Sequence, residues 1–103
     1  MAERFVRIDK RYATDGSPMT ASDYVYDVDG REVFVEVHAT VIHEWNAPGS
    51  EVKQVSEQQI QQAITVLIKE ERGAGWSPRE SNRLVLDEFR VRPIAERLGW
   101  TPR

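Results

Sequence analysis

The sequence predicts an α+β fold in which an antiparallel three-stranded sheet is followed by two or three helices packed on one of its faces. Strand-forming residues are concentrated before residue 46, on both sides of an Asp29-Gly30 pair. Serine capping signals and apolar residues at helical spacing occupy the second half of the chain. Strands followed by helices are typical of α+β proteins. With 103 residues, 40% of them apolar, the chain is expected to form one domain, residues 1–103.

Three extended segments are expected, at about residues 4–9, 23–28 and 31–45. Turn-forming residues at 14–18 separate the first two segments, and Asp29-Gly30 separates the second from the third. A two-residue hairpin turn would pair Tyr26 with Val33, whereas a three-residue loop would pair Asp27 with Arg31. We favour the two-residue turn, because burying tyrosine against valine outweighs one exposed pair of like charges.

The third segment is too long for one regular strand in so small a domain. At about 3.4 Å per residue it would extend past the rest of the chain. The adjacent pair Val41-Ile42 also breaks the alternation of apolar and polar residues. A bulge or bend is therefore expected near Thr40.

A helix over residues 57–72 has the clearest start and stop signals. Ser56 and Gln59 have the spacing of a capping box, and Gly73 follows as a stop signal. The expected buried stripe comprises Ile60, Ala63, Ile64, Leu67 and Ile68.

Two further helices are expected, at 78–90 and 93–98. Ser77 is placed as an N-cap, followed by proline at the first helical position and glutamate at the third. The residue before Pro93 is restricted away from helical geometry, so a break is expected there. Gly99 provides the final stop.

Several classes of function have no support in the sequence. The chain has no cysteine, which excludes disulfides, thiolate nucleophiles and zinc-cysteine clusters. His38 and His43 would point to opposite faces of a regular strand, and no third ligand lies near them even if the bend brings them together. We therefore expect a non-enzymatic protein with no catalytic residue, metal or cofactor.

The location expected from the sequence is the cytoplasm, with no contact with a membrane. No apolar run approaches the roughly 18 residues that a membrane span needs. The first residues also lack the basic and then apolar order of a secretory signal.

If the helices cover one face of the sheet, the other face is available to a partner. That face should carry large apolar groups among polar ones. The predicted contact residues are Phe34, Glu36, His38 and Ile42. The function expected is therefore protein binding or regulation, with either another protein or a second copy of the chain as the partner, through the sheet face or a sheet edge.

The alternative is a nucleic-acid-binding accessory protein. Residues 72–103 contain seven arginines against four carboxylates, although the whole chain has a net charge of −3. The arginines proposed to contact phosphates are Arg79, Arg83, Arg90 and Arg97. The first three would share one face of the expected 78–90 helix, and binding would weaken steeply as salt rises.

Overall fold

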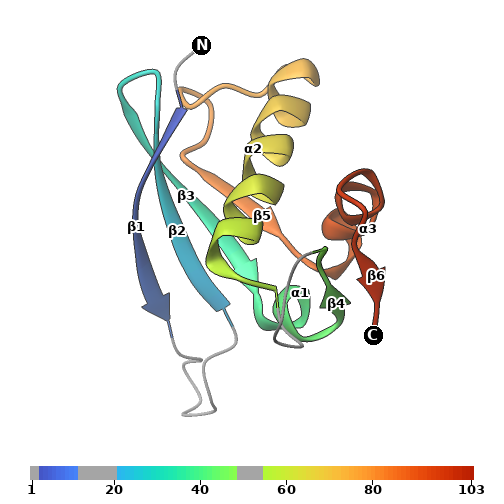
Figure 1. The fold of residues 1–103 in the computed structure, drawn as a ribbon. Helices are drawn as coiled ribbons and strands as arrows, with labels where there is room; N and C mark the ends of the chain where they lie inside the picture. The colour runs from blue at the N-terminus through green and yellow to red at the C-terminus, as the bar shows by residue number, and fades with distance from the viewer. Residues whose placement is uncertain (1–2, 12–20, 49–54) are drawn as a thin grey trace.

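The computed structural model describes residues 3–11, 21–48 and 55–103, and Figure 1 shows its α+β arrangement. The elements in chain order are β1 (Glu3–Arg11), β2 (Ala21–Val28), β3 (Arg31–His38), α1 (Ala39–His43), β4 (Trp45–Asn46), α2 (Glu57–Gly73), β5 (Arg83–Leu86), α3 (Glu88–Arg97) and β6 (Thr101–Pro102). The turn predicted at residues 14–18 lies outside the described residues. No helix in the described ranges is long and apolar enough to cross a membrane.

The main sheet has four strands in the order β1-β2-β3-β5. The first three strands pair antiparallel, and β5 lies parallel to β3. The predicted α+β class is confirmed, but the prediction of three antiparallel strands is wrong, because a fourth strand makes the sheet mixed. β4 and β6 form a separate two-stranded ladder.

The hairpin has the register that the two-residue turn predicts. Tyr26 lies opposite Val33, and Tyr24 lies opposite Val35. The turn residues Asp29 and Gly30 both have positive φ, 53° and 81°, as a tight hairpin turn requires. The tyrosines and valines therefore share one face of the sheet and are buried.

The single long strand predicted at 31–45 is wrong. The regular pairing ends at His38, and the chain then makes the short helix α1 at the place where a bend near Thr40 is predicted. This helical turn directs Val41 into the core, where it is fully buried. The adjacent apolar pair is thus explained by a change from strand to helix rather than by a bulge.

Helix α2 agrees closely with its prediction. The Ser56 hydroxyl accepts from the Gln59 backbone N–H, and the Gln59 side chain accepts from the Ser56 N–H at 2.9 Å. The five residues predicted for its buried stripe are all buried. They pack in one cluster with the tyrosines and valines of the hairpin, so α2 covers that face of the sheet.

The helix predicted at 78–90 is wrong, because these residues form a turn, the strand β5 and the start of α3. Leu84 and Leu86 are buried, whereas Val85 between them belongs to the other face, which is the two-residue period of a strand. The N-cap is Asp87, which accepts from the N–H groups of Phe89 at 3.0 Å and Arg90 at 2.8 Å.

The break predicted before Pro93 is also wrong, because α3 runs through this residue. Proline removes one donor, the one that would bond the carbonyl of Phe89. Phe89 is in the exposed first turn of the helix, where water can bond that carbonyl. Gly99, with φ 77°, then ends α3 as predicted, and the Trp100 N–H donates to the Ala95 carbonyl at 2.8 Å.

Candidate functional site

All the described helices contribute to the core on one face of the main sheet, and no described helix covers the other face (Figure 1). We call this second face the open face. Its side chains alternate along the strands with those of the core. They include those of Arg4, Arg7, Asp9, Ala21, Asp23, Val25, Asp27, Glu32, Phe34, Glu36, His38, Arg83 and Val85.

The middle of the open face is a row of four residues, one from each strand. Arg7 lies opposite Val25, Val25 opposite Phe34, and Phe34 beside Arg83. Val25 is fully buried beneath its neighbours, and Phe34 is half-buried. The guanidinium carbon of Arg83 lies 5.6 Å from the centre of the Phe34 ring. The row is therefore an apolar centre with an arginine at each end.

Next to this row, three carboxylates lie side by side across β1, β2 and β3. Asp23 is opposite Asp9 on one strand and Glu36 on the other, an arrangement of like charges that needs compensation. Arg83 compensates it with two bonds to Asp23, at 3.0 and 3.3 Å, and a third to Glu36 at 3.4 Å. The paired hydrogen bonds with Asp23 raise the pKa of the Arg83 guanidinium. The Asp23 side chain is only 8% exposed, so the carboxylate of this ion pair is shielded from solvent.

His38 extends this network at the end of β3. Its Nε2 lies 2.9 Å from Oε2 of Glu36, so the carboxylate of Glu36 has a cationic or polar partner on each side.

The other side of the middle row carries weaker, exposed pairs. There Arg7 bonds Glu32 at 3.3 Å, in addition to its bond to Asp9 on the first side at 3.2 Å, and Arg4 lies 3.8 Å from Asp27. Across the described open face, five carboxylates face three guanidinium groups. Among the described side chains of the face, carboxylates therefore outnumber guanidinium groups by two.

The structure brings together three of the four predicted contact residues. Phe34, Glu36 and His38 alternate along β3 and share the open face. Ile42 does not join them, because β3 ends before it and α1 turns its side chain against the core. The predicted four-residue surface is therefore reduced to three residues.

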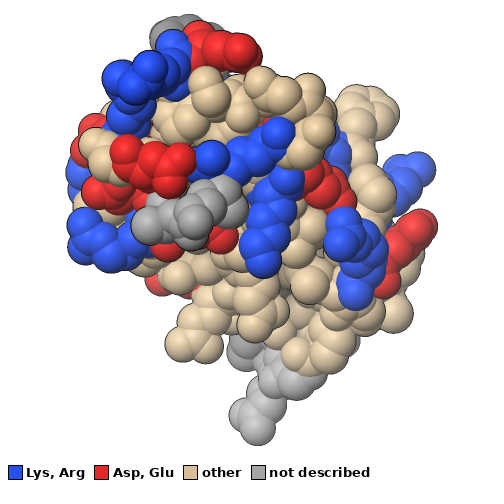
Figure 2. Space-filling view, turned by 90° about the horizontal axis from the view of Figure 1, so that it is seen from above, with Lys and Arg blue, Asp and Glu red and all other residues tan. Residues whose placement is uncertain are grey.

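The arginines of the nucleic-acid alternative do not share one helix face. Arg83 is on the open face, and Arg79 is exposed in the turn before β5. Arg90 pairs with Glu71, and Arg97 pairs with Glu70, so both fasten α3 to α2. Figure 2 shows basic and acidic groups alternating on the face seen from above, without one continuous basic patch.

Sequence reasoning missed most of the charged partners on the open face. Asp23 could have been found, because the favoured hairpin register already places it opposite Glu36. Arg83 could not, because a predicted helix hid the strand that carries it. Within the described residues no three histidine or carboxylate side chains are grouped as a metal site would need.

Comparisons of the chain with protein-family models, curated proteins and solved structures find no significant match. The function is therefore argued from geometry and charge.

Proposed function

We propose that this protein is a non-enzymatic protein-binding module whose open face holds a basic segment of a partner protein. The observation that carries the proposal is the middle row of that face, where the half-buried Phe34, packed beside the buried Val25, lies between Arg7 and Arg83. Aromatic and arginine side chains at the centre of a surface with a polar rim are the composition of a protein interface.

The face suits a partner better than the edges of the sheet do. The β1 edge has a register shift between Phe5 and Arg7, which bends a strand away from further pairing. The opposite edge is β5, which has only four residues. Adding a strand at either edge would therefore be disfavoured, whereas side-chain contact with the face requires no free backbone groups.

The charge of the face favours a basic partner over a second copy of the chain. Two copies meeting face to face would each bring more carboxylates than guanidinium groups among their described side chains, and like charges across an interface are costly. A segment with arginine or lysine would instead meet Glu32 and Asp27. Glu32 is 52% exposed and has an exposed pair that a partner's cation can replace.

The test is a titration of two synthetic peptides, one alternating arginine and leucine and the other alternating glutamate and leucine. Backbone amide resonances of the ¹⁵N-labelled protein would be followed by NMR. We expect only the basic peptide to shift Val25, Phe34 and their neighbours, with an affinity that falls as salt rises. Equal effects of the two peptides, or shifts located elsewhere, would contradict the proposal.

Two variants separate binding at the face from general attraction to an acidic protein. Phe34→Ala removes the apolar centre and Glu32→Lys reverses a rim charge, so each should weaken the binding of the basic peptide by about tenfold. The matched control is Phe89→Ala, because Phe89 is 74% exposed on α3 and outside the open face. If the control weakens binding as much as Phe34→Ala does, the open face is not the binding surface. If sedimentation shows a dimer that Phe34→Ala dissociates, the partner at the open face is a second copy of the chain and not a basic segment.

A further inference from the structure

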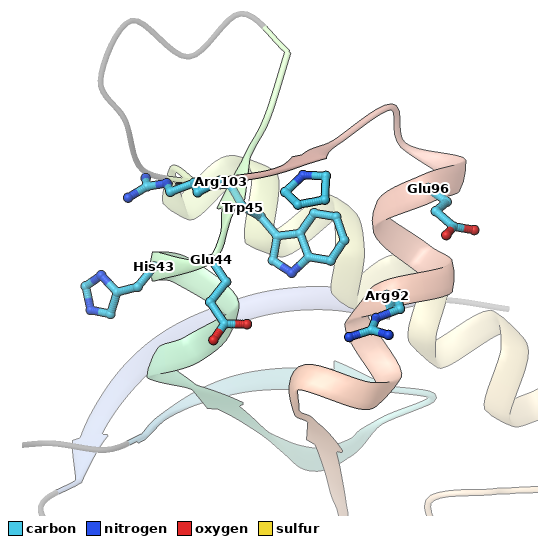
Figure 3. A pocket seen from close by; sticks show the side chains of 7 residues that line it. His43, Glu44, Trp45, Arg92, Glu96 and Arg103 are labelled. Carbon is cyan, nitrogen blue, oxygen red and sulfur yellow. Dashed lines mark hydrogen bonds between the residues drawn. The ribbon is translucent and has the colours of Figure 1, made fainter.

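A pocket of about 550 Å³ lies where the β4-β6 ladder meets α1 and α3, away from the open face (Figure 3). Its lining residues are His43, Glu44, Trp45, Arg92, Glu96, Pro102 and Arg103. Hydrogen bonds from Arg103 hold the lining residues of β4 and β6 together. The Arg103 N–H donates to the Glu44 carbonyl at 2.9 Å, and the Arg103 Nε donates to the Trp45 carbonyl at 3.2 Å.

The wall of the pocket contains the indole N–H of Trp45, which donates to no described residue. Trp45 as a whole is only 7% exposed. Figure 3 shows the ring nitrogen turned toward the space between Glu44 and Arg92. The N–H therefore faces the pocket, where an acceptor on a ligand can replace water as its hydrogen-bond partner.

Two opposite charges face each other across the same space. In Figure 3 the carboxylate of Glu44 and the guanidinium of Arg92 extend toward one another, whereas Glu96 and His43 point away. No ion pair joins Glu44 or Arg92 to any described residue. Each can therefore bind a group of opposite charge that enters between them.

We propose that this pocket binds a small zwitterion of the amino-acid type. The ligand's ammonium group would pair with Glu44, and its carboxylate would accept from Arg92 and from the indole N–H of Trp45. The flat surfaces of Trp45 and Pro102 would contact the ligand's side chain. A volume of about 550 Å³ is within the usual range for small-molecule sites.

The requirement for both charges follows from the lining. Glu44 and Arg92 are exposed, so an amine alone would leave Arg92 and the indole N–H bonded to water, and an acid alone would leave the Glu44 carboxylate bonded to water. A zwitterion makes a direct contact with all three groups. The site should therefore discriminate by charge pattern more than by side-chain size.

The experiment follows the indole N–H resonance of Trp45 by NMR, assigned by its loss in Trp45→Phe. The probes are leucine, 3-methylbutylamine, which lacks the carboxylate, and 4-methylpentanoate, which lacks the ammonium. We expect leucine to shift the resonance saturably in the millimolar range, and each single-charge analogue to bind about tenfold more weakly. No saturable shift with leucine, or equal binding of either analogue, would overturn the proposal.

Variants then assign the two charges. Glu44→Gln and Arg92→Gln should each weaken the binding of leucine by about tenfold, because each leaves one charge of the ligand unpaired. Glu96→Gln is the matched control, since Glu96 lines the same pocket but points away from the space between the two charges. The Glu96→Gln variant should bind leucine with the same affinity as the unmodified protein. Equal loss in the control would overturn the assignment. The resonances of Trp76 and Trp100 report whether each variant keeps its fold.

Discussion

Replacing Arg83 by glutamine should destabilise the protein more than replacing any other exposed arginine of the C-terminal third. The guanidinium bonds Asp23 twice and Glu36 once, and it covers the Phe34 ring. Without it, Asp23 remains almost fully buried between two facing carboxylates, Asp9 and Glu36. The loss is therefore one of charge compensation rather than of packed volume.

The expected size follows from the burial of the two partners. Breaking a fully buried ion pair costs about 3–5 kcal/mol, and a fully exposed pair contributes about 0–1 kcal/mol. Asp23 is buried, but the Arg83 side chain is 41% exposed, so water screens the basic side. Glutamine also keeps one amide donor for Asp23. We expect Arg83→Gln to lower the free energy of unfolding by about 2 kcal/mol at neutral pH.

Urea unfolding followed by circular dichroism measures this change as a shift of the midpoint at constant slope. The matched control is Arg97→Gln, because Arg97 and its partner Glu70 are both exposed, and its cost should be below about 0.5 kcal/mol. Equal costs for the two variants would refute the reasoning.

Three further predictions concern the cap, the core and the pH dependence. Asp87→Ala should cost about 1 kcal/mol in urea unfolding, because it removes the acceptor for two N–H groups at the start of α3, whereas Asp87→Asn should cost only a few tenths. Tyr26→Phe should raise the free energy of unfolding by up to about 1 kcal/mol, because it removes a buried hydroxyl that has no partner, and a clear loss would contradict this. Burial raises the pKa of Tyr24 to about 12, so above about pH 10 the folded state keeps a proton that the unfolded state loses. The free energy of unfolding should therefore fall by about 1.4 kcal/mol per pH unit between about pH 10 and 12. Tyr24→Phe should make this fall less steep.

The parts of the fold that the sequence predicted correctly depend on contacts between near neighbours in the chain. The hairpin register follows from a two-residue turn and from which side chains it pairs, and Tyr26 lies opposite Val33 as expected. The capping box of Ser56 and Gln59 is likewise read from four consecutive residues. Such signals act before any distant segment is in place, so they could be recognised without a structure.

The segment after Gly75 could not be predicted in this way because two local signals competed. Ser77 and Pro78 imitate the start of a helix, and Leu84, Val85 and Leu86 fit either a helix or a strand over so short a run. The choice is made by β3, whose free edge accepts β5 and buries Leu84 and Leu86 beside the valines. A pairing between segments about fifty residues apart leaves no mark on local spacing.

The same distant pairing determines the charge of the candidate contact surface. Without β5, the open face would have Asp9, Asp23 and Glu36 in one row, with Arg7 beside Asp9 and His38 beside Glu36 among the side chains that the structure describes. The parallel strand places Arg83 against that row, which allows Asp23 to be buried and gives Phe34 a cationic neighbour. The residues that make this face suitable for binding are thus assembled by tertiary structure, whereas the predicted contact residues among them all lie on β3. Any substitution that detaches β5 should therefore weaken binding at the open face before it unfolds the hairpin.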